Sequence, residues 1–137
     1  MAAQNLWGEI PSAGNIRTPI TILKEQAALL GQATNNVLQG DVTFSGGADY
    51  RTIFAGYTYD FTVTLFIVAP ALDYYRFAIL QVVYNINIYP LVVRNLADDF
   101  THDCTDEASF LNAIKEILSS EETHRIIQTL LSQSQAA

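Results

Sequence analysis

Apolar and polar positions alternate along two long runs in the middle of the chain, between residues 57 and 89. In the first run, which extends back to residue 53, every second position up to Ile67 is apolar, and several threonines and Asp60 occupy the positions between. Alternation with a period of two is typical of a β-strand with one buried face. The two runs therefore predict a long antiparallel hairpin with its turn at residues 70–73 and a bulge at Gly56.

The hydrophobic pattern also predicts the register of this hairpin. A slip of one residue would place the core face of one strand against the polar face of the other. With the turn at residues 70–73, Ile67 lies opposite Arg76 and Leu65 lies opposite Ala78, so the two core faces coincide. The same register makes the opposite face apolar near the turn. This turn-end patch is expected to consist of Phe66, Val68, Tyr75, Phe77 and Ile79.

The turn-end patch is the main functional signal in the sequence. Surfaces rich in aromatic residues and poor in charge are typical of the centres of protein interfaces. The sequence leaves three occupants open: the protein's own helices or N-terminal arm, a second copy or another protein, and a small ligand. We interpret the five residues of the patch as interface residues.

Helical periodicity appears on both sides of the hairpin. Thr18, followed by proline, predicts the start of a helix over residues 19–32. Shorter strands are expected at residues 37–45 and 91–95, with a turn at Gly46 and Gly47 after the first. Two further helices are expected near the C-terminus, the first capped by Thr105 or Asp106 and the second by Ser119 with Glu122.

These elements define the fold class. They predict a single α+β domain with an antiparallel sheet of three to five strands, one N-terminal helix and two C-terminal helices, in the order α-β-β-β-(β)-α-α. Residues 1–17 lack periodicity and predict an extended N-terminal arm, with Trp7 and Ile10 as its anchors. Residues 18–132 form the domain, and residues 133–137 are expected to be a frayed tail.

Charge and composition argue against several classes of partner. Fourteen acidic and seven basic residues give a net charge of −7, and the basic residues are scattered, so we expect no nucleic-acid partner. Polar residues and Pro90 interrupt the longest charge-free apolar run, residues 77–93, so we expect no membrane span. The single cysteine, Cys104, and the lack of a visible secretory signal predict a cytoplasmic protein.

Side chains of metal-ligand type crowd together in residues 98–107, which include His102, Asp103 and Cys104. Their spacing matches neither a zinc nor a calcium site, and a solvated acidic loop before a helix explains them. A thiolate–imidazole pair of His102 with Cys104, or a general base at Asp60, lacks the further groups that catalysis needs. The sequence therefore assigns no catalytic, cofactor-binding or metal-binding residue.

Seven tyrosines give the chain a second candidate feature. Each combines apolar area with a polar tip, which suits either core packing or the lining of a ligand cavity. They occupy positions 50, 57, 59, 74, 75, 84 and 89.

Two short stretches, residues 18–26 and 68–76, resemble segments of a family of small bacterial proteins of unknown function. The resemblance covers about a third of the chain. Because that family is itself uncharacterised, the resemblance implies no functional residue.

The turn-end patch and the lack of a catalytic constellation favour a non-enzymatic, cytoplasmic protein-interaction module, such as an adaptor, a chaperone or an immunity-type binder. Its expected partner is a second copy, in a homodimer, or another protein. The alternative is a small-ligand-binding protein or enzyme whose tyrosine-lined cavity uses Asp60, or His102 with Asp103.

Overall fold

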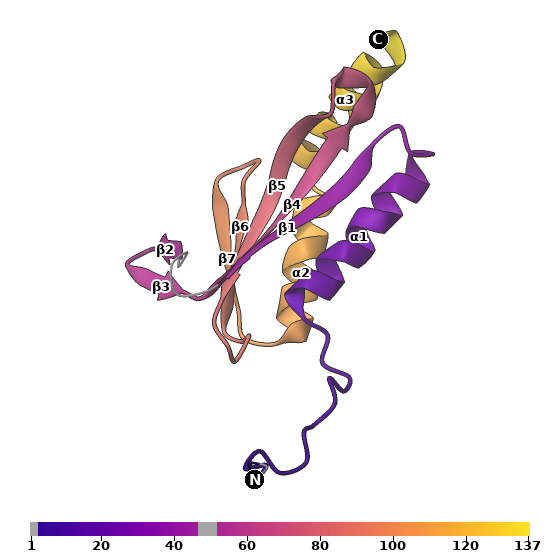
Figure 1. Ribbon diagram of the computed structural model, residues 1–137. Coiled ribbons are helices and arrows are strands. Elements are labelled where there is room, and N and C mark those ends of the chain that lie inside the picture. The colour runs from indigo at the N-terminus through magenta and orange to yellow at the C-terminus, as the bar shows by residue number, and fades with distance from the viewer. Residues whose placement is uncertain (1–2, 47–51) are drawn as a thin grey trace.

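The computed structural model describes residues 3–46 and 52–137. In chain order the elements are α1 (Pro19–Ala33), β1 (Gln39–Gly46), β2 (Thr52–Phe54), β3 (Tyr57–Tyr59), β4 (Phe61–Ala69), a 3-10 turn (Pro70–Leu72), β5 (Tyr75–Tyr84), β6 (Leu91–Asn95), β7 (Phe100–Cys104), α2 (Glu107–Leu118) and α3 (Glu121–Ala136). One antiparallel sheet has the strand order β1-β4-β5-β6-β7, and β2 and β3 form a separate two-stranded sheet. The helices lie on one face of the larger sheet (Figure 1), which confirms the expected α+β class.

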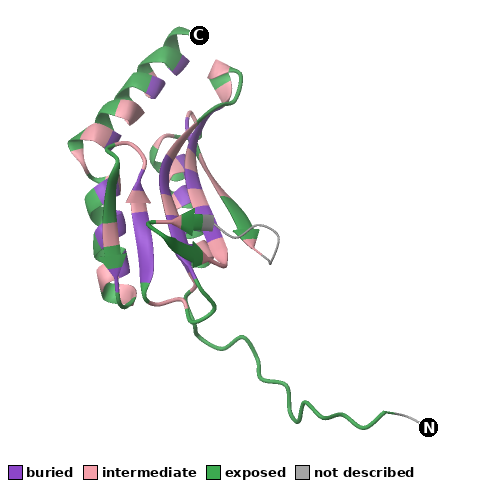
Figure 2. Cartoon of the chain, turned by 90° about the vertical axis from the view of Figure 1, so that its left-hand side faces the viewer, coloured by how far each residue is buried: buried purple, intermediate pink, exposed green. Residues whose placement is uncertain are grey.

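The hydrophobic core fills the layer between this sheet and the helices. Alternate residues of β4 and β5, including Val63, Leu65 and Val82, point into it and are buried. Leu23 of α1 and Phe110 of α2 close the layer from the helix side. Figure 2 shows the buried segments along the central strands and on the inner sides of the helices. Burial of these side chains supplies the main favourable contribution to folding.

Local capping explains where the helices begin. The Thr18 side chain accepts a hydrogen bond from the Thr21 amide, and Asp106 caps α2, as expected. The third cap is Ser120 rather than Ser119, because Ser119 ends α2 and its amide donates to a carbonyl of that helix. The buried Thr123 hydroxyl donates to a carbonyl of α2 at 2.7 Å, which fixes the corner between the two helices.

The expected single strand over residues 53–67 is wrong, because the chain reverses within it. Ala55 and Gly56 have φ values of 53° and 82° and form the two-residue turn of the β2–β3 hairpin. Gly56 therefore lies at a turn instead of a bulge. The other expected glycine turn, at Gly46 and Gly47, extends outside the described residues.

The connection between β4 and β5 is one residue longer than expected. The 3-10 turn Pro70–Leu72 is followed by Asp73 and Tyr74, and both of these residues have a φ of 58°. Five residues therefore separate the strands, and Ala69 pairs with Tyr75. A displacement of one position exchanges the two faces of a strand, so the residues of β5 next to the turn lie on the face opposite to the expected one.

A β-bulge restores the expected faces farther from the turn. The register shifts next to Leu65 and leaves Ile79 without a cross-strand partner. Beyond the bulge, Leu65 pairs with Leu80 and Val63 pairs with Val82, two positions from the expected partners. An even displacement keeps the core faces together, so the prediction holds for the far half of the hairpin and fails near its tip.

Two further segments differ from expectation. Part of the acidic segment is an edge strand, β7, which pairs with β6 from Leu91 with Cys104 to Asn95 with Phe100. At the C-terminus, α3 continues to Ala136, where we expected a frayed tail.

Candidate functional site

The structure separates the residues of the turn-end patch. Phe66 and Val68 lie on the outer face of the sheet, away from the helices. Tyr75 and Phe77 pair with core-facing residues of β4 and therefore lie on the helix side, while Ile79 is buried in the core. The five side chains thus do not share one surface.

A charged side chain from β5 covers part of the outer face. The Arg76 guanidinium carbon lies 4.3 Å from the centroid of the Phe66 ring, and its Nη2 atom donates to Asp41 Oδ2 at 2.8 Å. Because Asp41 lies opposite Phe66 on β1, the arginine spans three strands. This arrangement shields the aromatic ring that the sequence assigned to an interface.

We expect substitution of Arg76 by alanine to lower the free energy of unfolding by about 1 kcal/mol, because both the cation–π contact and the exposed ion pair are lost. Asp41→Asn removes only the charge of the partner and should cost less than about 0.5 kcal/mol. Urea denaturation of both variants measures the difference. Equal losses would show that the contact between Arg76 and Phe66 contributes nothing.

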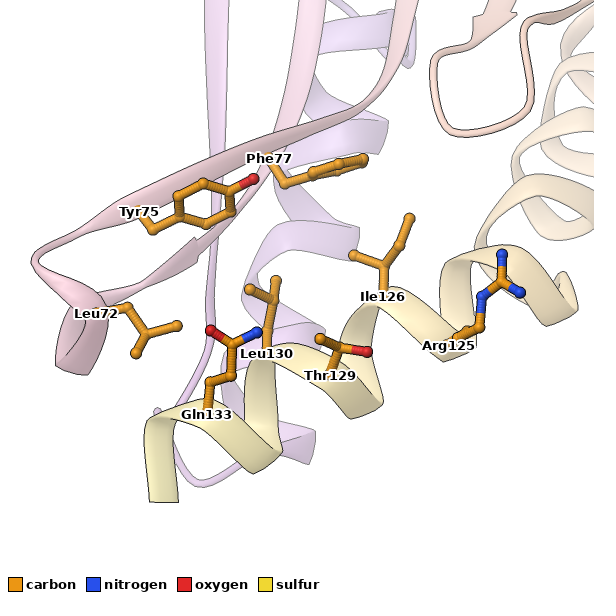
Figure 3. Close-up of a pocket in the computed structure, with 8 residues that line it drawn as sticks. All are labelled: Leu72, Tyr75, Phe77, Arg125, Ile126, Thr129, Leu130 and Gln133. Atoms are coloured by element: carbon orange, nitrogen blue, oxygen red, sulfur yellow. The ribbon is translucent and has the colours of Figure 1, made fainter. Parts of the chain in front are cut away.

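Tyr75 and Phe77 instead line a groove of about 490 Å³ between the β4–β5 tip and α3, which we call the tip groove. Figure 3 shows its apolar side chains facing one another from the two elements. Tyr75 is 48% exposed, and Phe77 and Ile126 are half-buried, so the groove presents apolar surface to solvent. The full lining is Leu72, Tyr75, Phe77, Arg125, Ile126, Thr129, Leu130 and Gln133.

The local backbone positions both walls of the tip groove. The left-handed residues Asp73 and Tyr74 lengthen the connection, and this turns Tyr75 toward the helix side. On α3, Ile126 and Leu130 lie one helical turn apart and therefore share one stripe. Sequence analysis predicted a helix here but assigned neither Ile126 nor Leu130 to a site, so it missed both as lining residues.

The tip groove is suited to binding apolar side chains. Among the described residues that line it, the one charged group is Arg125, which forms an ion pair with Glu122. The hydrogen bond and the charge of Glu122 raise the pKa of Arg125, so this side chain remains a cation. Thr129 and Gln133 add neutral polar groups at the rim.

In β7, the candidate residues His102 and Cys104 point toward the helices, whereas Asp103 points to the outer face. Cys104 is buried, and its thiol donates to the Ser109 carbonyl at 3.6 Å. Burial, with the charge of Asp103, raises the pKa of Cys104, which disfavours the nucleophilic thiolate. His102 lies 3.8 Å from Glu116 on the helix side. Within residues 3–46 and 52–137, no group of three His, Cys, Asp or Glu side chains is placed to hold a metal ion.

The remaining candidates are dispersed over the molecule. The Asp60 amide donates to Asn85 Oδ1 at 2.9 Å, at the junction of β3 and β4. Tyr84 is buried in the core, whereas Tyr75 lines the tip groove. Tyr57, Tyr59 and Tyr89 line a different hollow. Tyr50 lies outside the described residues.

The N-terminal arm is extended and exposed. Figure 1 shows residues before α1 leading away from the body of the protein. The expected anchoring of the arm by Trp7 and Ile10 is wrong, since both side chains are exposed, as are Leu6 and Ile16. Near α1, the arm is held through Arg17, which forms ion pairs with Glu25 and Glu107.

Among the described helices, none is long and apolar enough to cross a membrane. Comparison of the chain with protein-family models, with curated proteins and with solved structures finds no match.

Proposed function

We propose that this protein is a self-associating interaction module, in which the tip groove of one copy binds the N-terminal arm of another. The observation that carries the proposal is the presence of two exposed apolar surfaces in one chain. One is the tip groove, and the other is the arm with Leu6, Trp7 and Ile10. Mutual burial of these surfaces is favourable by about 25 cal/mol per Å² of apolar area.

The position of the arm favours exchange between copies. In both views (Figures 1 and 2), the arm leaves α1 at the end of the molecule opposite the β4–β5 tip and the C-terminal end of α3, the elements that form the tip groove. It therefore points away from the groove of its own chain. When extended, the segment between Trp7 and α1 spans about 36 Å, which is long enough to cross to a neighbouring molecule. Exchange of a terminal segment is a common route to symmetric dimers.

The chemistry of the two surfaces is also matched. Trp7 supplies a large, rigid aromatic side chain of the type that dominates interface energetics. The tip groove supplies apolar walls from two elements, with Arg125 as its charged group. Glu9, two residues after the tryptophan, offers an opposite charge. This proposal keeps the interaction function expected from the sequence and moves it from the turn-end patch to the tip groove.

Light scattering and tryptophan fluorescence test this proposal together, because Trp7 is the single tryptophan of the chain. We expect a dimer in which Trp7 emission is blue-shifted and protected from a soluble quencher. Trp7→Ser should weaken dimerisation by about 30-fold, the effect of losing an aromatic hot spot. Thr129→Arg should block the tip groove and also give a monomer with a solvated Trp7.

Gln128→Arg is the matched control, since it adds the same charge to the neighbouring, exposed position of α3 but lies outside the groove lining. It should leave the dimer intact. Circular dichroism verifies that all three variants are folded. A monomeric wild-type protein, with Trp7 either solvated or shielded within its own chain, would overturn the proposal. A dimer that survives both Trp7→Ser and Thr129→Arg would do the same.

A further inference from the structure

The small β2–β3 hairpin covers part of the outer face of the sheet, on the side opposite the helices. Arg94 of β6 lies 4.5 Å from the centroid of the Phe54 ring in β2. Beneath the hairpin, Val83 is 0% exposed and Val92 is also buried, although both point away from the core. The hairpin, marked by exposed arrows in front of the sheet in Figure 2, therefore forms a second packed layer over β5 and β6.

A hollow of about 430 Å³ lies between this hairpin, the loop of residues 85–90 and β7. Its volume falls within the range of about 300–1,000 Å³ that is typical of small-molecule sites. Tyr57 and Tyr59 lie two positions apart on β3 and so share one face. Tyr59 is half-buried, whereas Tyr57 is 69% exposed and lies at the mouth. We call this site the tyrosine hollow.

The tyrosine hollow has an acidic character. Asp103 of β7 lines it, and its described lining contains no lysine, arginine or histidine. Asp103 forms no ion pair with any residue of the described ranges. The basic residue two pairs along the β6–β7 ladder, Arg94, is held by Gln81 Oε1 at 2.6 Å and by the Phe54 ring. Among the described residues, therefore, no cation pairs with the carboxylate that lines the hollow.

The aromatic groups and the carboxylate are close enough to interact. Burial, followed by the charges of Asp103 and Tyr57, raises the pKa of Tyr59. Tyr59 therefore remains a neutral phenol at physiological pH. The faces of neutral aromatic rings carry partial negative charge and attract cations, most strongly where water is partly excluded. A carboxylate beside two tyrosine rings therefore selects a positive ligand and disfavours an anionic one.

We propose that the tyrosine hollow binds a small organic cation of the ammonium or methylated ammonium class, with Asp103 as counter-ion and Tyr57 and Tyr59 as aromatic walls. The side-chain amides of Asn85 and Asn87 provide neutral hydrogen-bonding groups on the loop side for a hydroxyl of the ligand. The site lies on the outer face of the sheet and the tip groove on the helix side, so ligand binding and self-association are separate properties.

Titration of the full-length protein with choline, followed by amide NMR, tests the proposal. We expect choline to bind with a dissociation constant on the order of 1 mM and to shift the amide signals of Tyr59 and Asp103. The neutral isostere 3,3-dimethylbutan-1-ol, which has carbon in place of the ammonium nitrogen, should not bind. Asp103→Asn should weaken choline binding by about tenfold, because the counter-charge is lost.

Asp99→Asn is the matched control, since it removes the same charge from an exposed residue outside the hollow. It should bind choline as the wild type does. Tyr57→Leu keeps apolar bulk at the mouth, removes the ring and should weaken binding severalfold, which gives a second test if Asp103→Asn folds poorly. Equal affinity for choline and its neutral isostere, equal weakening by the two aspartate variants, or no binding of choline at millimolar concentrations would overturn the proposal.

Discussion

Replacing Gly40 by alanine should destabilise the protein by about 3 kcal/mol, because β1 and α1 approach too closely for a side chain. A Cβ atom at Gly40 would lie 2.4 Å from the Ala27 Cα atom and 2.8 Å from the Ala27 carbonyl oxygen. These obstacles are backbone atoms, so relief requires the helix to move away from the strand. Urea denaturation followed by circular dichroism measures the loss.

Two further substitutions identify the cause of this destabilisation. Gly31→Ala adds a Cβ within α1, where its nearest neighbour is the Asn36 side chain at 3.1 Å. Alanine favours a helix by up to about 1 kcal/mol over glycine, so this control should change stability little or improve it. Ala27→Gly, combined with Gly40→Ala, removes a Cβ but leaves the obstructing backbone. Full recovery in that double variant would show that side-chain crowding, and not backbone contact, limits the approach.

The close approach at Gly40 illustrates which features a sequence reveals. Period-two alternation over residues 61–69 and 75–84 correctly indicated two paired strands, because each strand has one face in water or in a second layer and one in the core. The caps Thr18 and Asp106 were also visible, since capping depends on residues within one turn of each other. Local chemistry dominates in each of these cases.

Register was not visible, because it depends on backbone angles that side-chain type leaves open. Nothing in the sequence marks Tyr74, an aromatic residue, for a φ of 58°, yet this residue adds the fifth position to the connection. The bulge at Ile79, which compensates for the longer connection, depends on the pairing of β4 with β5 and not on local side-chain type. Because the turn-end patch relied on the register, its five residues separate into an outer pair, Phe66 and Val68, an inner pair that lines the tip groove, and Ile79, which is buried in the core.

The missed strand β7 and the missed turn between β2 and β3 show a different limitation. In β7, Thr101 and Asp103 point to the outer face while His102 and Cys104 point to the helix side, a period of two hidden by polar residues at an edge. The turn at Ala55 and Gly56 carries a glycine signal, but the alternation continues through it. The tyrosine hollow depends on β7 and on this turn, so the sequence alone could not bring Tyr59 and Asp103 together.

A second large loss of stability is expected for Phe110→Ala. Phe110 is 0% exposed, and its ring packs edge to face with Tyr89 at a centroid distance of 6.4 Å. Removing a buried phenylalanine costs about 3–5 kcal/mol, and we expect about 4 kcal/mol here, since the cavity lies between a helix and a sheet that cannot both relax. Urea denaturation checks this value. The loss of unfolding free energy in Phe110→Leu should be less than half of the loss in Phe110→Ala.

Phe100→Ala is the matched control, because it deletes the same side chain from a residue that is 60% exposed at the edge of the sheet. It should change the free energy of unfolding by less than about 1 kcal/mol. A similar loss at both positions would mean that the packed layer between α2 and the sheet is not the source of stability. Phe110 also holds Tyr89 in place at the loop side of the tyrosine hollow. Phe110→Leu should therefore weaken choline binding even where the protein remains folded, whereas Phe100→Ala should leave it unchanged.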